Sequence, residues 1–193
     1  MFHWTDILGL GYLGFELFIL ATRRGKAKAK SAKSAKSADR GTIYAAWSLI
    51  LGSCIIGFFL ARHITALNWP AHSPAIIGVA VLLEASGIAL RIWAIRHLGR
   101  FFTVAVGIQH GHHVIQDGPY RFVRHPSYSG SLLALVGLGC LTFNWLGLIL
   151  IAICTFWAYA IRIPVEEKAM LAEFGAEYEQ YSARTKRMIP GIY

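Results

Sequence analysis

Long apolar stretches separated by short polar segments dominate this chain. Spanning the hydrocarbon core of a membrane takes about 20 mainly apolar residues in a helix. Five stretches approach that length: residues 4–22, 43–61, 75–95, 127–143 and 145–163. Asp6 and Glu16 interrupt the first stretch, and the fourth is so short that it must stand upright or be sheltered by its neighbours. Since no stretch alternates with a period of two, the pattern predicts an all-α membrane bundle of five transmembrane helices.

The composition supports the same interpretation. Of the 193 residues, 55% are hydrophobic, and the mean hydropathy is +0.49, which leaves little polar surface for a water-soluble domain. The first apolar stretch lacks the basic leading region and small-residue cleavage site of a signal peptide, so we expect it to be retained as a helix. Cys54, Cys140 and Cys154 lie in apolar stretches without metal-ligand spacing, and we interpret them as small core residues.

The distribution of basic residues predicts how the helices are oriented. Residues 23–40 hold eight of the nineteen Lys and Arg residues, whereas the loop between the second and third helices holds only Arg62. Because short loops rich in Lys and Arg stay in the cytoplasm, the N-terminus is expected outside, and residues 96–126 and 164–193 are expected in the cytoplasm. The Ala, Lys and Ser repeats of the basic loop have no apolar face. We therefore interpret them as a flexible linker and topology signal rather than a lipid-binding surface.

We expect one domain, residues 1–193, with two unequal roles. Residues 1–95 supply three transmembrane helices and the basic loop. Residues 96–193 supply the chemistry, through a helical hairpin over 127–163 and a C-terminal cap helix. Turn signals at Asn68-Trp69-Pro70 and at Asn144-Trp145 mark the outer end of the bundle.

The first polar segment of interest precedes the fourth helix. Pro126 suits the first turn of a helix, whose free N–H groups and positive dipole favour a carboxylate or another anion. Arg121 and Arg124 have two open interpretations, either as anchors at lipid headgroups or as parts of a site. His125 and Tyr128 indicate a site more strongly, because the proline between them imposes a specific local geometry.

The second polar segment lies where the fifth helix leaves the membrane. Pro164 is expected to kink or restart that helix. Glu166 and Glu167 then have two interpretations: they stabilise the first turn of the restarted helix, worth about 0.3–1 kcal/mol, or one of them binds the ammonium of a cationic cofactor. Arg162, about one turn further into the membrane, is costly there without a task and is expected to face a buried anion.

An amphipathic cap helix is expected beyond this segment. Leu171, Phe174, Tyr178 and Tyr181 would share one of its faces. Gly175 would cost stability inside such a helix unless close packing over a cofactor requires it.

Two further groups of polar residues need an interpretation. Four histidines lie between the third and fourth helices or at their ends: His97, His110, His112 and His113. Their spacing matches no zinc pattern and no Cys or carboxylate cluster joins them, so we expect no metal. Glu16 and Glu84 lie inside apolar helices, where ionisable residues are functional candidates by default. Each could instead pair with an arginine, Arg91 in the case of Glu84.

Together, the two polar segments resemble a known family. The resemblance covers about residues 97–193 and rests on these residues: Gly118-Pro119-Tyr120, Val123-Arg124-His125-Pro126-Ser127-Tyr128, Arg162, Glu166-Glu167, Phe174-Gly175, Glu177-Tyr178, Tyr181, Arg187 and Pro190. They resemble the isoprenylcysteine carboxyl methyltransferase family. The short five-helix form is similar to its prokaryotic branch, which lacks the additional N-terminal helices of the eukaryotic enzymes. The resemblance thus implies a multi-pass protein of a bacterial or archaeal inner membrane.

The resemblance implies a methyltransferase that uses S-adenosylmethionine, releases S-adenosylhomocysteine, and holds the cofactor in a cytosolic pocket under the cap. The positions that would line this pocket are His112, His113, Val114, Ile115, Tyr120, Arg124, His125, Pro126, Ser127, Tyr128, Glu166 and Glu167. Val114 and Ile115 depart conservatively from the family's Leu-Val. Glu167 and Arg162 would be the catalytic pair, with Glu167 binding the cofactor and Arg162 holding the substrate's carboxylate or an equivalent polar group.

The acceptor that the resemblance implies is lipophilic and enters sideways from the bilayer, most simply an isoprenylcysteine-like carboxylate. A small isoprenoid, a phospholipid amine or a thiol stays open. So does an NADPH-dependent sterol-type reductase of related fold, although Glu166-Glu167 followed by Phe174-Gly175 favours the methyltransferase. A non-catalytic membrane adaptor would leave Arg162 unexplained. Expected partners are membrane lipids and a prenylated or small lipophilic substrate, and no nucleic acid.

Overall fold

The computed structural model describes residues 11, 12, 14, 16, 33–69, 73–102, 111 and 113–193, with residues 33–40 described by their backbone alone. The α-helices are α2 (Lys33–His63), α3 (Pro74–Leu98), α4 (Pro126–Cys140), α5 (Trp145–Phe174) and α6 (Ala176–Arg184). Short 3-10 helices cover Thr65–Leu67, Gly99–Phe101 and Gly118–Arg121. Within these ranges there is no β-strand, so the all-α prediction is confirmed there. Most of the first predicted helix and residues 23–32 of the basic loop lie outside the described residues. Residues 33–40 of that loop form the first turns of α2, so the prediction of a flexible linker is wrong for this part of it.

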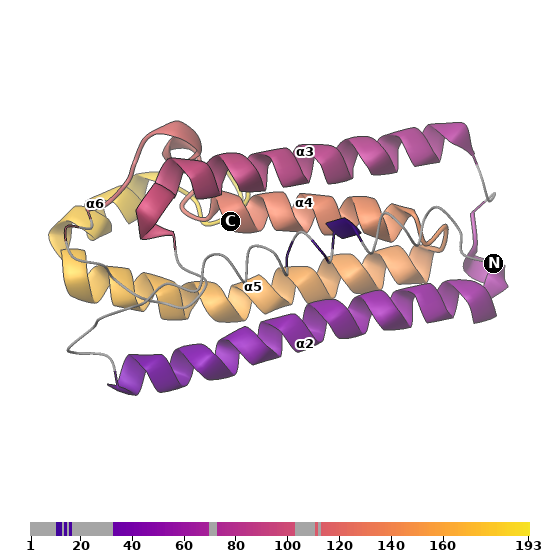
Figure 1. Cartoon of the computed structure of the whole chain (residues 1–193), viewed down its shortest axis with the longest axis horizontal. Helices are drawn as coiled ribbons and strands as arrows, with labels where there is room; N and C mark the ends of the chain where they lie inside the picture. Colours follow the sequence, from indigo (N-terminus) through magenta and orange to yellow (C-terminus); the bar gives the residue numbers. More distant parts are fainter. Residues whose placement is uncertain are drawn as a thin grey trace.

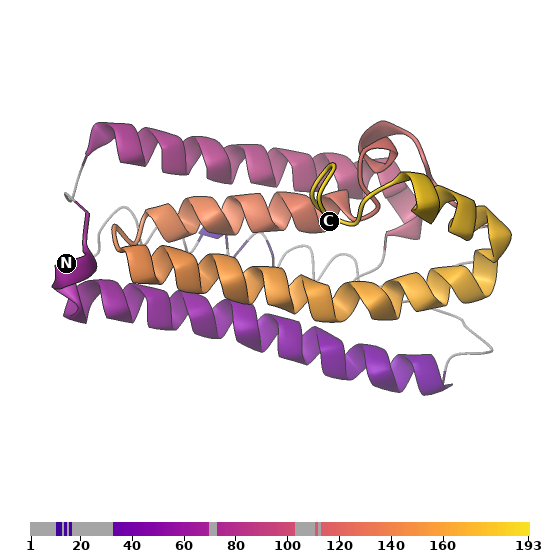
Figure 2. The same cartoon turned by 180° about the vertical axis from the view of Figure 1, so that it is seen from behind.

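The four long helices form an elongated antiparallel bundle (Figures 1 and 2). α4 and α5 lie at its centre, α3 packs on α4, and α2 packs on α5. α3 and α5 end where α4 begins, and α6 lies at this same end. We call it the polar end, because it carries both polar segments recognised in the sequence.

Three of the helices are long and apolar enough to cross a membrane: Gly41–His63, Pro74–Phe101 and Trp145–Phe174. These helices confirm the predicted stretches 43–61, 75–95 and 145–163, and each helix begins within two residues of the predicted start. The fourth predicted stretch corresponds to α4, which has 15 residues and is therefore only about 22 Å long. Two thirds of its residues are buried, so its neighbours shelter it as the short stretch required.

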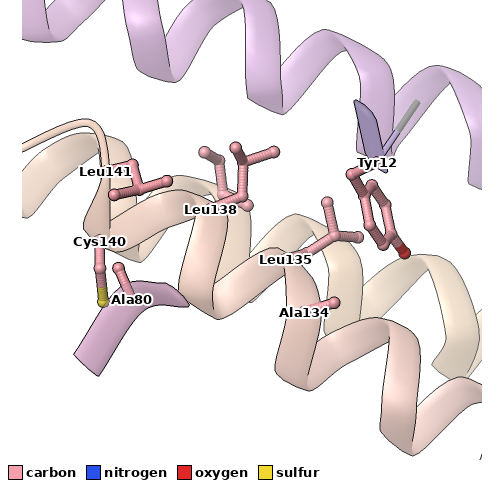
Figure 3. Close-up of a cluster of buried hydrophobic side chains, with 8 residues drawn as sticks. Tyr12, Ala80, Ala134, Leu135, Leu138, Cys140 and Leu141 are labelled. Carbon is pink, nitrogen blue, oxygen red and sulfur yellow. The ribbon is translucent and has the colours of Figure 1, made fainter. Parts of the chain in front are cut away.

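Apolar side chains from α3 and α4 form the main core together with Tyr12 (Figure 3). Leu135 and Leu138 of α4 and Leu141, directly after it, point into this core and are at most 4% exposed. On their outer faces, α2, α3 and α5 expose large apolar residues such as Phe59, Leu82 and Trp157. A long helix that is apolar on its exposed side as well as its buried side is typical of contact with lipid.

Glycines allow α3 and α4 to approach each other closely. A Cβ atom on Gly130 would lie 2.6 Å from the carbonyl oxygen of Gly87, and one on Gly137 would lie 2.7 Å from the backbone nitrogen of Glu84. Real Cβ atoms do not come so near to backbone atoms, so alanine at either position would push the helices apart. Small residues at the contact are the usual way in which membrane helices pack tightly.

The opposite end of the bundle is joined by a buried asparagine. Asn144 caps α5 by accepting a hydrogen bond from Gly147 N at 3.1 Å, and its Nδ2 donates to Asn68 Oδ1 at 2.6 Å. Trp69 N donates to the carbonyl of Phe143 at 2.8 Å. The two turns predicted from separate dipeptides therefore form one connected structure.

Arg91 makes a buried polar contact that differs from the predicted one. Its Nη2 lies 2.7 Å from Glu16 Oε2, and its Nη1 donates to the carbonyl and hydroxyl of Ser127 at 3.0 and 3.1 Å. Glu84 is also buried, but its Oε2 has no hydrogen-bond partner within the described part of the chain. Of the two alternatives left open for each carboxylate, pairing with an arginine therefore holds for Glu16 and not for Glu84. Seven positions separate Glu84 from Arg91 by about 10 Å along α3, and Arg91 turns toward the start of α4.

α5 runs through Pro164 without a break, so the predicted restart at this proline is wrong. A proline costs one helical hydrogen bond, but the preceding residues Arg162 and Ile163 are almost fully buried and hold the helix in place on its packed side. Consequently Glu166 and Glu167 lie inside a continuous helix rather than in a first turn. Because no helix starts at Pro164, the interpretation that Glu166 and Glu167 stabilise a first helical turn is wrong.

The chain instead breaks eleven residues later, at Gly175. Its φ of 51° and ψ of −124° end α5 and start α6, and a Cβ there would meet nothing within 4 Å. The glycine is therefore needed for backbone conformation rather than for close packing. The single cap helix expected from the sequence is two helices, and Leu171 is 48% exposed instead of sharing the buried face of Tyr178 and Tyr181.

The C-terminal segment, residues 185–193, folds back onto the start of α4. The carbonyls of Lys186 and Arg187 accept hydrogen bonds from Arg124 N and His125 N at 2.8 and 2.9 Å. Met188 is 1% exposed and packs in a cluster with Tyr159 and Ile163 of α5. The segment therefore fixes the loop before α4 against the end of α5.

Candidate functional site

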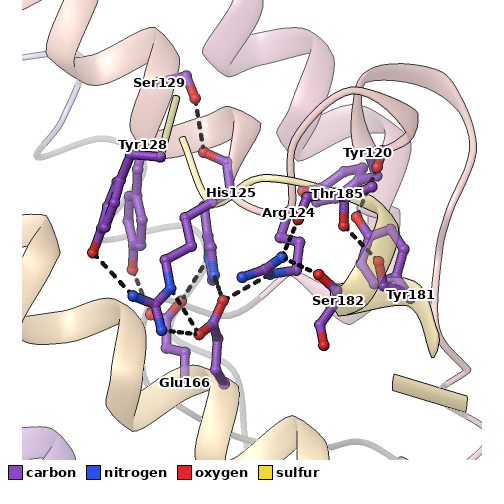
Figure 4. A network of polar contacts seen from close by, with 12 residues as sticks. Tyr120, Arg124, His125, Tyr128, Ser129, Glu166, Tyr181, Ser182 and Thr185 are labelled. Atoms are coloured by element: carbon purple, nitrogen blue, oxygen red, sulfur yellow. Dashed lines mark hydrogen bonds and ion pairs between the residues drawn. The ribbon is translucent and has the colours of Figure 1, made fainter. Parts of the chain in front are cut away.

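Charged and aromatic side chains converge at the polar end, where α4 begins and α5 ends (Figure 4). One group comes from the loop and first turn of α4, and the other from the last turns of α5. The C-terminal segment and α6 close the site from a third side. The two sequence motifs, about forty residues apart, are thus brought into direct contact.

The first part of this site is a closed set of three side chains. Arg162 Nε lies 2.9 Å from Glu166 Oε1, one helical turn further along α5, and donates to the Tyr128 hydroxyl at 2.7 Å. Tyr128 in turn donates a short hydrogen bond to the same Glu166 oxygen. The Arg162 side chain is 5% exposed and that of Glu166 is 20% exposed. The anion expected to face Arg162 is therefore, in this structure, the chain's own Glu166.

The second part is Glu167, which is held by two arginines. Arg124 Nε donates to its Oε1 at 2.8 Å, and Arg187 donates to its Oε2 from Nε at 3.0 Å and from Nη2 at 2.8 Å. The hydrogen bonds to Glu167 raise the pKa of Arg187, so this guanidinium stays charged. Two cations on one carboxylate leave this part of the site with an excess positive charge.

His125 lies between the two carboxylates. Its Nδ1 is 3.6 Å from Glu166 Oε2, and its Nε2 is 3.5 Å from Glu167 Oε1. Nε2 is buried and makes no hydrogen bond among the described residues. The ring also begins an aromatic stack: His125 and Tyr128 have ring centroids 5.7 Å apart, and Tyr128 and Tyr159 have centroids 4.3 Å apart, with interplanar angles of 10° and 14°.

Aromatic residues form the wall of the cap. Tyr181 donates to the carbonyl of Tyr120 at 2.7 Å, and Tyr178 and Val114 pack beside it. Burial raises the pKa of Tyr120, Tyr178 and Tyr181, so these phenols stay neutral at ordinary pH. Gly118, with a φ of 54°, holds the preceding turn directly against the ring of His97.

The structure brings together six of the thirteen predicted site residues. Arg124, His125, Tyr128, Arg162, Glu166 and Glu167 are in mutual contact. Pro126 and Ser127 are buried at the start of α4, but the Ser127 hydroxyl faces Arg91 instead. Tyr120 and Val114 belong to the wall of the cap. Ile115 directly follows Val114 in the sequence. The ring of His113 lies 5.5 Å from that of Phe101, and His112 falls outside the described residues.

Sequence reasoning gave no role to two residues of this site. Arg187 binds Glu167 across twenty positions; it was among the residues of the family resemblance, but nothing in the sequence indicated that Glu167 is its partner. Tyr159 stacks on Tyr128 and donates to Ser131 Oγ at 2.5 Å. A signal for Tyr159 did exist, because it lies three positions before Arg162 and therefore on the same face of α5.

Comparison with known proteins identifies relatives of this chain. The model of the isoprenylcysteine carboxyl methyltransferase (ICMT) family matches residues 78–172, which include the start of α4 and both carboxylates. A probable protein-S-isoprenylcysteine O-methyltransferase from Oryza sativa subsp. indica is 33% identical over 142 residues, covering 71% of this chain and 74% of the relative. The predicted family resemblance is therefore confirmed.

Two further relatives extend the comparison. The solved structure of the eukaryotic intramembrane Ras methyltransferase ICMT matches with a TM-score of 0.65 and 25% identity, covering 76% of this chain and 52% of that one. This chain thus spans about half the length of that enzyme. Methanethiol S-methyltransferase 1 from Bradyrhizobium diazoefficiens is 25% identical over 147 residues, covering 72% of this chain and 50% of the relative.

Proposed function

Because the chain belongs to the isoprenylcysteine carboxyl methyltransferase family, we propose that it transfers a methyl group from S-adenosylmethionine to a lipophilic acceptor at the cytoplasmic face of the membrane. The acceptor that we favour is the carboxylate of an isoprenylcysteine-like compound. The observation that carries the proposal is the meeting of Glu166 and Glu167 with Arg124, Arg162 and Arg187 at the boundary between apolar helices and cap.

The residues present fit the cofactor. When bound, S-adenosylmethionine supplies a methyl group activated by a sulfonium, and its amino-acid part carries an ammonium and a carboxylate. The polar end offers both complementary charges side by side, since Glu167 is flanked by Arg124 and Arg187. The buried Nε2 of His125, without a hydrogen bond among the described residues, is a further polar atom available to a ligand. An uncharged group would bind only weakly to these paired carboxylate and guanidinium groups, because the strong hydrogen bonds here are those between opposite charges.

Each side chain then has a defined task. Glu167 binds the cofactor's ammonium, and Arg124 and Arg187, which now hold Glu167, bind the cofactor's carboxylate and so balance the charge. Tyr128 and the rings stacked with it exclude water from the adjoining space. Arg162 orients the acceptor's carboxylate, with Glu166 as its resting partner. Methyl transfer is an in-line displacement, so holding the nucleophile at about 3–3.5 Å in a dry site is the main requirement.

A carboxylate nucleophile is already ionised and needs no general base. A thiol acceptor is the second candidate, because a methanethiol S-methyltransferase is among the relatives. A thiol reacts as its thiolate and needs a base within reach. His125 and Glu166 are the groups that could accept its proton. The two acceptors therefore differ in whether His125 is needed for catalysis or only for binding.

Ligand-induced stabilisation of the full chain in detergent tests the proposal. S-adenosylhomocysteine at 100 times its Kd should stabilise the protein by about 2.7 kcal/mol, whereas NADPH should not change the melting temperature. Stabilisation by NADPH instead would favour a reductase. No stabilisation by millimolar S-adenosylhomocysteine, in a sample that melts cooperatively, would rule out the proposed cofactor.

The side of the membrane needs a separate measurement. We place the polar end in the cytoplasm because the basic loop and most other Lys and Arg residues are expected on that side. Single cysteines introduced at exposed Lys168 and exposed Trp145, in a variant without the three natural cysteines, should react with a membrane-impermeant maleimide from opposite sides of sealed vesicles. Labelling of both from one side would contradict the topology.

A further inference from the structure

A cavity of about 310 Å³ opens between α6 and the C-terminal segment. Four basic residues line it: Arg124, Arg184, Lys186 and Arg187. Ile192 and Tyr193 form its apolar side, and none of its lining residues is acidic. The cavity therefore combines a strongly basic wall with an apolar one.

Not all of this positive charge is neutralised by the protein. Arg124 and Arg187 share Glu167, but Arg184 and Lys186 are exposed and form no ion pair among the described residues. Arg184 makes its hydrogen bond to Gln116, which is uncharged. Among the described residues Glu167 is the only acidic side chain paired with these four cations, so the cavity keeps a net positive charge at neutral pH. Such a concentration of Arg and Lys favours a phosphate-bearing anion.

The two walls face different surroundings. The apolar wall adjoins the membrane-spanning part of α5, because the ring of Tyr193 lies 5.4 Å from that of Phe156. Ile192 is 76% exposed beside it. The basic wall adjoins α6 and the loop before α4, where Arg124 also donates to the carbonyls of Ser182 and Thr185 (Figure 4). The cavity thus crosses the boundary between the apolar helices and the polar cap.

We propose that this cavity binds the headgroup phosphate of an anionic phospholipid, with the lipid's acyl chains lying along Ile192 and the apolar face of α5. A free phosphate would use the basic wall alone and would leave the large exposed side of Ile192 in water. A lipid uses both walls at once. This site is separate from the proposed acceptor position, because its lining does not include Arg162 or Tyr128.

Native mass spectrometry of the full chain in a neutral detergent tests this site directly. Dioleoyl phosphatidylglycerol should bind at a defined stoichiometry of one, and zwitterionic dioleoyl phosphatidylcholine at least about tenfold more weakly. The double variant Arg184→Gln/Lys186→Gln should weaken phosphatidylglycerol binding by about 25-fold, since each basic residue near an anionic headgroup contributes about fivefold.

A matched control removes the same two charges elsewhere at the polar end. Arg121→Gln/Lys168→Gln changes two exposed basic residues that do not line the cavity, and it should weaken binding by less than about threefold. Equal losses in the two double variants would show general surface attraction and overturn the site. Millimolar inorganic phosphate that bound as tightly as the lipid would overturn the lipid assignment. Unliganded melting temperatures confirm that both variants fold.

Discussion

Two arginines lie buried in the apolar helices, and the structure uses them differently. Arg91 in α3 is 7% exposed and Arg162 in α5 is 4% exposed. Each has a carboxylate within 3 Å, Glu16 for Arg91 and Glu166 for Arg162. By burial and pairing alone the two are alike, and the cost of placing a charge in an apolar environment is similar for both.

Their surroundings separate them. Arg91 joins parts of the fold that are distant in sequence: Glu16 lies 75 positions away, and Ser127 offers a backbone carbonyl. Arg162 pairs with Glu166 within one turn of its own helix. Glu166 in turn lies beside His125, which also approaches a second carboxylate, Glu167. The comparison teaches that a buried ion pair alone does not mark a reactive site. Convergence of several ionisable groups at a helix boundary is the feature that makes the polar end the candidate site.

Removing Arg91 should have the largest effect on stability. Arg91→Ala leaves Glu16 buried without its cation, which should lower the free energy of unfolding by about 3–5 kcal/mol. Denaturation in detergent micelles measures this loss. The double variant Arg91→Met/Glu16→Gln should recover most of it, because no uncompensated charge remains. An Arg91→Ala variant as stable as the parent would contradict a structural role.

Removing Arg162 should mainly affect transfer. Arg162→Ala should lower methyl transfer to an N-acylated S-farnesylcysteine by about 100-fold or more, equivalent to about 2.7 kcal/mol, while S-adenosylhomocysteine still stabilises the protein. A radiolabelled-methyl assay and thermal melting measure the two effects. Arg121→Ala, an exposed arginine of the same end, is the control. If Arg162→Ala lost cofactor binding as well as methyl transfer, Arg162 would contact the cofactor rather than the acceptor.

Glu167 should show the reverse separation. Glu167→Ala should abolish the stabilisation of about 2.7 kcal/mol expected at 100 times Kd of S-adenosylhomocysteine, because the ammonium loses its carboxylate. Glu173→Ala, on an exposed face of the same helix, should retain it. Unliganded melting temperatures separate loss of binding from loss of fold. If the ligand still stabilised Glu167→Ala fully, the proposed cofactor contact would be wrong.

Tyr159 connects the two regions and should give the smallest effect. Its hydroxyl bonds Ser131, which also bonds Tyr12, whereas its ring stacks on Tyr128. Tyr159→Phe keeps the stack and removes one hydrogen bond, so it should lower stability by about 1 kcal/mol and leave transfer nearly unchanged. Tyr159→Leu also removes the stack and should reduce transfer further. Equal transfer in both variants would show that the stack does not position Tyr128.

Much of the bundle could be predicted from the sequence. The predicted stretch 75–95 corresponds to α3 (Pro74–Leu98), and the predicted stretch 127–143 corresponds to α4 (Pro126–Cys140). The hairpin at Asn144 was also predicted correctly. This agreement is expected because, in lipid, the backbone N–H and C=O groups of a single segment find hydrogen-bond partners within a helix. The length of an apolar stretch therefore indicates a helix by itself.

The end of α5 could not be predicted in the same way. Pro164 and Gly175 are both helix-breaking residues, and the sequence favours a break at the first of them. The structure breaks the helix at Gly175, because packing around Arg162 and Ile163 outweighs the lost hydrogen bond at the proline. The outcome depends on contacts with α4 and with the C-terminal segment, which no local pattern contains.

The sequence by itself determined the membrane class, the family and the identity of the ionisable groups at the polar end, because residue type, apolar length and motif spacing are local properties. Tertiary structure decided which charges pair. It joined Arg91 to Glu16 rather than Glu84, and it placed Arg187 on Glu167. The physical reason is that a charge in a low-dielectric interior is stabilised by whichever opposite charge the packing brings within about 3 Å, and distance in space is not encoded by distance along the chain.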